Sequence, residues 1–194
     1  MQPIYRTLRQ EKMSDLILKQ NLPTISEGLD SVRAYQFEVQ FILPTAVGDA
    51  AAGQKLTLAA KQVTAAGFTT EDIEVMRVND KVFYPGRATP DEITVTFDNF
   101  YKQNGEVGAL LFQWFQHVFN PMSGEYNMGG QANGFKANSM SILSLDGKGA
   151  IDYETKLLGV YPKSWKTAEF NYATNEFHTI EVVFRYDFMD HISV

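Results

Sequence analysis

The stretch RVNDKVFYPGRATPDEITVTFDNF, residues 77–100, has the strongest pattern in the chain. Its second half alternates apolar and polar residues, as a strand with one buried and one solvated face does. The apolar positions are Ile93, Val95 and Phe97. The first half, with Val82 and Tyr84, is predicted to be another strand, and Pro85-Gly86 is predicted to turn the chain between the two. The stretch favours strand pairing and carries no pattern of catalytic residues.

Composition limits the classes of protein that the chain can belong to. The 194 residues are 44% hydrophobic and 13% aromatic, which suits a single domain with a substantial core and favours β structure. The chain has no cysteine, so disulfides, zinc–thiolate sites and thiol nucleophiles are excluded. Its net charge of −6 argues against a basic nucleic-acid-binding surface. No apolar run is long enough to span a membrane, so we expect no membrane insertion by this chain.

The remaining segments predict a mainly β protein. Residues 1–33 are predicted to be an N-terminal arm, and residues 34–194 a β domain. Residues 44–54 are small and turn-rich, which predicts a mobile loop. Further strands are predicted at residues 34–43, 55–63, 136–146, 150–162 and 176–189. The predicted fold class is an antiparallel β-sandwich or barrel with one flanking α-helix and the N-terminal arm.

The predicted helix covers about residues 104–119. Apolar residues follow one another at helical spacing within it, which indicates a face directed at the core. These residues are Leu110, Leu111, Trp114, Phe115 and Val118. Asn104 is the expected N-cap, and Asn120-Pro121 is expected to end the helix.

The sequence contains no convincing arrangement for catalysis or metal binding. His117, His178 and His191 are far apart and lack the spacing of a metal-binding motif. Gly129 and Gly134 have the spacing of a phosphate-binding loop, but Phe135 stands where that motif requires lysine. We therefore predict no enzymatic activity, no cofactor and no metal.

Two groups of motifs, taken in chain order, resemble the major tail tube proteins of contractile-tailed bacteriophages. The first group is Asn79, Lys81, Gly86, Arg87, Asp91 and the strand Thr94 to Phe97. The second group is Leu145, Asp146, Gly149, Leu158, Gly159, Pro162, Thr179, Glu181, Val182, Phe184 and Asp187. The resemblance runs from about Ala34 to the C-terminus, with the helix between the two groups.

The resemblance implies a structural virion protein. Subunits of such tubes form hexameric rings whose inner sheets join edge to edge, and the rings stack into a hollow tube inside the tail sheath. The implied partners are other copies of the chain, the sheath protein, the tape-measure protein and baseplate or tube-end proteins. Double-stranded DNA would pass through the lumen during genome ejection without sequence-specific binding. The implied location is the phage tail, with assembly in the host cytoplasm.

Three alternatives remain open from sequence. The chain could be the tube subunit of a bacterial contractile injection or type VI secretion system, which shares the fold. It could be a variant that begins or ends a tube. An unrelated β-rich hydrolase or sugar-binding module would need a pocket with converging polar groups, and the sequence shows no clustered candidates.

Two sets of residues are predicted to act in assembly. Glu74, Glu154 and Glu181 alternate with apolar neighbours and are expected to line the lumen, the alternative being an ordinary solvated face. The arm and the loop at residues 44–54 are expected to act between subunits or rings, the alternative being a disordered tail and a solvated loop. The loop residues named for this contact are Pro44, Gly48, Asp49 and Gly53.

Overall fold

The computed structural model describes residues 32–101, 107–127, 134–173 and 175–193. The chain divides into two units, residues 1–36 and residues 37–194, and every helix and strand below belongs to the second. Almost all of the predicted arm, and the predicted cap Asn104, lie outside the described residues. The arm's predicted role and boundary therefore stay predictions.

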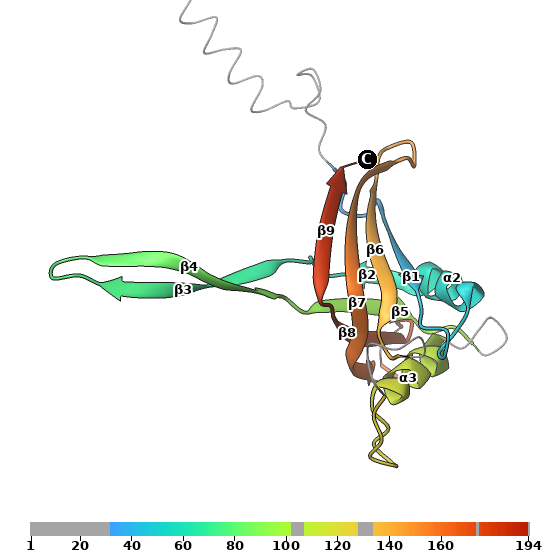
Figure 1. The fold of residues 1–194 in the computed structure, drawn as a ribbon. Coiled ribbons are helices and arrows are strands. Elements are labelled where there is room, and N and C mark those ends of the chain that lie inside the picture. The colour runs from blue at the N-terminus through green and yellow to red at the C-terminus, as the bar shows by residue number, and fades with distance from the viewer. Residues whose placement is uncertain (1–31, 102–106, 128–133, 174, 194) are drawn as a thin grey trace, which may run out of the picture. The chain divides into compact units, whose positions relative to one another are not determined.

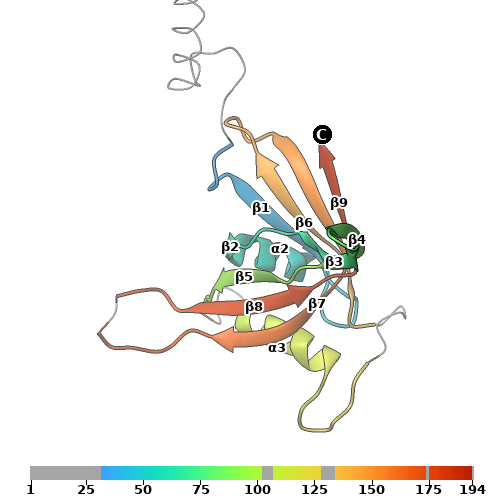
Figure 2. The same cartoon turned by 90° about the vertical axis from the view of Figure 1, so that its left-hand side faces the viewer.

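Two antiparallel sheets share one long strand, β7 (Ile151–Thr167), as Figures 1 and 2 show. Sheet A has the order β1-β6-β7-β9, with β1 (Phe37–Ile42), β6 (Ala137–Leu145) and β9 (Phe188–Ser193). Sheet B has the order β2-β5-β8-β7, with β2 (Ala60–Val63), β5 (Ile93–Asp98) and β8 (Thr179–Arg185). The first half of β7 pairs in sheet A, and its second half pairs with β8 in sheet B. A register shift between Pro162 and Ser164 lies in that second half.

The core lies between the sheets, where the alternating apolar residues of both meet. Phe97 and Phe184 of sheet B pack against Phe41 of sheet A, with ring centroids 5.8 and 6.1 Å from it. The alternation predicted at positions 93, 95 and 97 is confirmed, because all three side chains are fully buried. The prediction of a sandwich or barrel resolves to an open sandwich, since the outer strands of sheet A do not close on one another.

The predicted helix is α3 (Val107–Val118) in its described part. Leu111 and Trp114 are buried, and the Trp114 ring lies 5.4 Å from that of Phe184. The indole N–H donates to the carbonyl oxygen of Phe135 at 2.9 Å. This bond satisfies the one polar atom of a fully buried tryptophan, so α3 is fixed on the core in the predicted orientation.

A second helix, α2 (Ala50–Ala59), corrects the predictions of a loop at 44–54 and of a strand at 55–63. Of that predicted strand, only the part that forms β2 is confirmed. The Asp49 carboxylate caps it by accepting from the Ala52 N–H at 3.0 Å. Gly53, a poor helix former, is buried where the helix crosses β1. A Cβ there would lie 2.4 Å from the Phe41 carbonyl oxygen, so close packing requires the glycine that made the segment look like a loop.

Of the opening stretch, only β5 belongs to the core of the sandwich. Strands β3 (Phe68–Met76) and β4 (Lys81–Pro90) form a separate two-stranded hairpin that projects from the sandwich (Figure 1). The chain turns at residues 77–80, where the Arg77 N–H donates to the Asp80 carbonyl oxygen. The turn predicted at Pro85-Gly86 is wrong. Gly86 instead faces the irregular pairing at Thr70–Asp72, where a Cβ would lie 2.7 Å from the Glu71 carbonyl oxygen.

The predicted strand at 176–189 is in fact two strands in different sheets. β8 ends at Arg185, and β9 begins at Phe188 beside the first half of β7. Tyr186 and Asp187 make the link between them. The apolar alternation at positions 180, 182, 184, 186 and 188 continues across the link and conceals the change of sheet, although Phe188 is exposed in β9.

Candidate assembly surfaces

Within the described residues, both outer strands of sheet A have a free edge. Among the described residues, β1 pairs only with β6, and β9 pairs only with β7. An unpaired edge presents backbone N–H and C=O groups that another strand can satisfy. The four strands alternate in direction, so β1 and β9 run antiparallel to each other at opposite ends of the sheet.

The face of sheet A that points away from the core carries both charged side chains and exposed apolar ones, among them Ile42, Leu158 and Phe188. The register places Glu38, Glu154, Lys156 and Asp190 there, opposite the core residues of the same strands. The Glu154 carboxylate accepts a hydrogen bond from Ser141 Oγ at 2.6 Å. With Asp152, two positions before Glu154 on β7, four carboxylates against one ammonium give this open face a negative charge.

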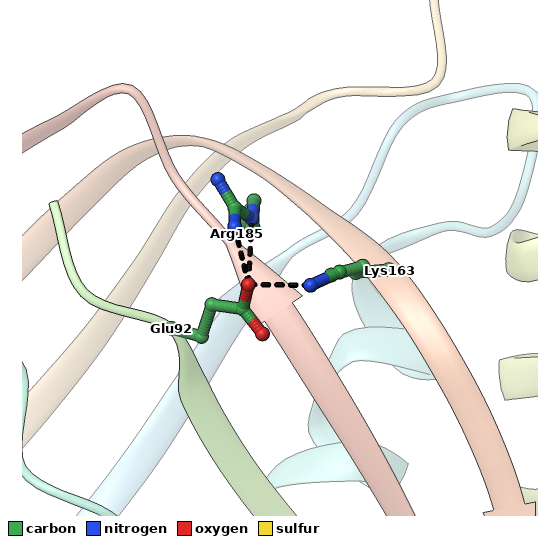
Figure 3. Close-up of polar contacts among 3 residues, drawn as sticks. All are labelled: Glu92, Lys163 and Arg185. Atoms are coloured by element: carbon green, nitrogen blue, oxygen red, sulfur yellow. Dashed lines mark hydrogen bonds and ion pairs between the residues drawn. The ribbon is translucent and has the colours of Figure 1, made fainter. Parts of the chain in front are cut away.

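The open face of sheet B has a different ratio of cations to carboxylates. The Glu92 carboxylate contacts two cations, Lys163 Nζ at 2.5 Å and the Arg185 guanidinium (Figure 3). These hydrogen bonds, that of Lys163 first, hold the pKa of Glu92 below its ordinary value. Lys166 lies opposite Glu181, and Lys61 lies 3.6 Å from Asp98. The cations of this face therefore balance its carboxylates.

One face of the hairpin is apolar near the tip. Its side chains are Ile73, Val75, Val82 and Tyr84, which pair as Ile73–Tyr84 and Val75–Val82. Ile73 is 55% exposed and Tyr84 48% exposed. A two-stranded hairpin alone is marginally stable in water, and clustered exposed apolar side chains mark interaction surfaces. This face is therefore a candidate interaction surface.

The opposite face of the hairpin combines an ion pair with the exposed apolar side chains of Phe83 and Met76. Lys81 Nζ lies 2.5 Å from the Glu74 carboxylate and 5.5 Å from the centre of the Phe83 ring. Met76 lies opposite Lys81 on this face.

The structure does not bring the three predicted lumen carboxylates together. Glu154 lies on the open face of sheet A, Glu181 on the open face of sheet B, and Glu74 on the face of the hairpin opposite its apolar face. The sequence pattern detected that each side chain points away from a core. The pattern did not indicate whether each strand belongs to sheet A, to sheet B or to the hairpin.

The four residues predicted to touch a neighbour lie at the start of α2. Asp49 and Gly53 have roles within the subunit, as cap and as packing contact. A Cβ on Gly48 would lie 2.8 Å from the Ala52 Cβ, and the Pro44 carbonyl oxygen accepts from the Val47 and Gly48 N–H groups. Their predicted contact with a second subunit or ring stays a prediction.

The described residues contain no group of three or more His, Asp or Glu side chains that could hold a metal ion. His117, His178 and His191 contact Asn127, Asn99 and Thr155 respectively, on separate elements. Among the described helices, none is both long and apolar enough to cross a membrane.

Comparison with known proteins shows relatives in fold. No protein-family model and no curated protein sequence matches the chain. A chain of the sheath–tube complex of the extracellular contractile injection system PVC, in its extended state, superposes with a TM-score of 0.63 at 16% identity, covering 90% of this chain and 99% of that one. A chain of the anti-feeding prophage baseplate, 6-fold symmetrised, gives 0.64 at 11% identity over 84% and 97% of the two chains.

A third similar chain comes from the cap that terminates the anti-feeding prophage tube. Its TM-score is 0.62 at 13% identity, covering 90% of this chain and 99% of that one. At such identities the likeness establishes the fold. The predicted relation to the tube proteins of contractile systems is thus confirmed at the level of fold.

Proposed function

We propose that the chain is a structural tube subunit, and that copies of it close into a ring through the two free edges of sheet A. The observation that carries the proposal is that, within the described part of the chain, the outer edges of β1 and β9 are both unpaired, in a fold that contractile injection particles share. With four alternating strands, β9 of one copy and β1 of the next run in opposite directions. Their pairing continues the antiparallel pattern and satisfies both edges.

The geometry of closure sets the width of the channel. One similar particle is 6-fold symmetrised, and six copies of a four-stranded sheet make a 24-stranded barrel. At about 4.8 Å per strand and a tilt of about 40°, such a barrel has a diameter of roughly 50 Å between backbones. This width admits a polymer or a small folded domain, so size alone does not choose the cargo.

The charge of the open face of sheet A supports a channel for an anionic polymer. In a closed ring this face lines the inside if the helices and sheet B lie outside. Glu38, Glu154 and Asp190 then recur in every copy, and the summed negative potential keeps a phosphate backbone from adhering to the wall. Of the three predicted lumen residues, Glu154 is the one that this arrangement places in the channel.

We assign the tube to a phage tail, in which it conducts double-stranded DNA and the tape-measure protein inside a sheath, as a component of the virion. The motifs that resemble major tail tube proteins support this assignment. A tube-end subunit, or the tube of an injection system, is the second candidate, because a chain of a tube-terminating cap is as similar in fold as a chain of a sheath–tube complex. A main tube subunit forms long tubes, whereas a tube-end subunit forms rings that do not stack.

Cysteine pairs test ring closure sharply because the chain has no cysteine of its own. Asp190→Cys on β9 is combined with Glu38→Cys, Gln40→Cys or Ile42→Cys on β1, which covers three registers on the open face. Oxidation of one of these pairs should give a ladder of linked subunits that ends at six. Single variants, and the pair Gln62→Cys with Lys166→Cys on sheet B, serve as controls.

Light scattering and negative-stain microscopy of the unmodified protein complete the test. Rings or tubes at high concentration are the expected result. A chain that stays monomeric at high concentration, with no ladder from any β1–β9 pair, would overturn the proposed function.

A further inference from the structure

The root of the β3–β4 hairpin is attached to the link between β8 and β9. The Tyr186 hydroxyl donates to the Gly67 carbonyl oxygen at 2.6 Å, and the Gly67 N–H lies 3.3 Å from the same hydroxyl oxygen. The Tyr186 ring meets Phe68 edge-on at 6.3 Å between centroids. Tyr186 is only 4% exposed, so it reaches the first residues of the hairpin from inside the sandwich.

The two strands of the hairpin are also joined to each other at this root. The Asp91 N–H donates to the Gly67 carbonyl oxygen at 3.0 Å, and Thr69 Oγ1 donates to the Asp91 carboxylate at 2.8 Å. The Gly67 carbonyl oxygen thus accepts both Tyr186 and Asp91. This one oxygen atom therefore links the residues that flank β3 and β4 to Tyr186 of the sandwich.

Tyr186 is itself held between two anchored neighbours. Arg185 binds Glu92, the residue after Asp91, and Asp187 binds Lys136 Nζ at 2.6 Å. The Asp187 N–H donates to the Leu158 carbonyl oxygen of β7 at 2.9 Å. Three consecutive side chains therefore attach to sheet B, to the hairpin root and to the start of β6. Both sequence neighbours of Tyr186 are thus held in place by their own contacts.

From this geometry we infer that Tyr186 is a positioning residue that fixes the direction in which the hairpin projects, and so where its apolar face meets a second copy of the chain. The inference about the second copy rests on the proposed function, whereas the direction of the hairpin is a property of a single subunit. β3 has nine residues, which at about 3.3 Å each gives a lever of roughly 30 Å. A swing of about 10° at the root would move the tip by about 5 Å, more than the reach of a packing contact.

Tyr186→Phe separates positioning from stability. The variant keeps the buried ring and its contact with Phe68, and the Gly67 carbonyl oxygen keeps the Asp91 N–H. The Gly67 N–H loses the oxygen that it approaches. Burial raises the pKa of Tyr186, so the wild-type hydroxyl remains a donor well above neutral pH.

The test measures the direction of the hairpin in the single subunit. Spin labels are placed at the hairpin tip by Val78→Cys and on α3 by Gln113→Cys, in the full chain with and without Tyr186→Phe. The expected result is a narrow distance distribution in the parent and one at least twice as broad in the Tyr186→Phe variant. Amide exchange at Gly67 should rise about tenfold, with no change at Val182 in the core. Tyr172→Phe, at a fully exposed tyrosine, is the matched control and should change neither measurement.

Assembly of the unlabelled proteins provides the second arm. The concentration at which rings form should rise at least threefold in Tyr186→Phe and stay unchanged in Tyr172→Phe. An unchanged distance distribution in the Tyr186→Phe variant overturns the inference. A broadened distance distribution with an unchanged assembly threshold also overturns it. If the wild type does not assemble at all, the proposed function fails, and the spin-label arm still decides whether Tyr186 directs the hairpin.

Discussion

Glu154 on β7 accepts a hydrogen bond from Ser141 on β6 at 2.6 Å, on the face of sheet A that points away from the core. The two residues are neighbours across the ladder, next to the Ser141–Lys156 pair. The carboxylate is therefore held above the sheet at a defined place. In a closed ring this position repeats once per subunit.

Glu154→Lys tests the channel. The substitution should leave ring assembly intact, because the side chain lies outside the core. Under the proposed phage-tail function, it should slow genome ejection from assembled virions at least tenfold, since fixed cations along the wall would hold phosphates. Ejection rates measured at two salt concentrations check this, and the defect should shrink at the higher one.

Glu181→Lys is the matched control for the channel assignment. It makes the same charge change on the open face of sheet B, which the proposed ring places outside the channel. Normal ejection from the Glu154→Lys particles, or an equal defect in both variants, would mean that the open face of sheet A does not line the channel.

The double variant Ile73→Gln/Val75→Gln tests the apolar face of the hairpin. Both side chains are exposed in the single subunit, so the melting temperature should change by less than a few degrees. Assembly should be lost or need at least tenfold more protein, because the candidate interaction surface is removed. Light scattering against concentration measures the threshold.

Met76→Gln supplies the comparison for the hairpin. It removes an exposed apolar side chain from the neighbouring position of the same strand, on the opposite face of the hairpin. This variant should assemble as the wild type does. Equal thresholds for all three proteins would show that the apolar face has no part in assembly.

Gly53→Ala tests the packing of α2 on β1. The added methyl group would lie 2.4 Å from the Phe41 carbonyl oxygen of β1, a strand that is paired with β6 along its whole length. The substitution should lower the free energy of unfolding by about 1–3 kcal/mol, although alanine favours helix. Gly147→Ala, with no atom within 4 Å of its added Cβ, should stay within about 0.5 kcal/mol of the wild type in the same denaturant titration.

The ion cluster at Glu92 predicts an acid dependence of stability. Because its pKa is lower in the folded protein than its ordinary value of 4.5, its stabilisation is present above that pH. The stabilisation is lost as the pH falls below 4.5, through the lowered folded pKa. Melting temperatures across this range should fall less for Glu92→Gln than for the wild type. Glu169→Gln, on the exposed β7–β8 connection, should keep the wild-type dependence.

Strand assignments that depend on local alternation were predictable from the sequence. Positions 93, 95 and 97 and the first strand of the β domain were found because each buries every second residue. The helix α3 was found because its apolar residues follow helical spacing. The helix α2 was missed because a glycine such as Gly53 locally indicates a loop. The glycine is required there by close packing against Phe41 of β1, which the local sequence does not show.

The assembly surfaces could be predicted only in part. Alternation showed that Glu74, Glu154 and Glu181 point away from a core, and the three then proved to lie on three different surfaces. Nothing in the local pattern of residues 68–90 separates a projecting hairpin from two strands of a sandwich. The separation is visible only when the exposure of Ile73 and Tyr84 is known.

The sequence by itself determined the class of fold, the position of α3, the absence of thiol chemistry and the acidity of the chain, because each follows from composition or from periods of two to four residues. The tertiary structure alone decided which strands leave an edge free, which face of which sheet carries the excess carboxylates, and how the hairpin is held at its root. Those features depend on pairs such as Gly67 and Tyr186, separated by 119 residues, or Glu92 and Arg185, separated by 93. Such contacts form only when the sheets pack, and no local pattern encodes them.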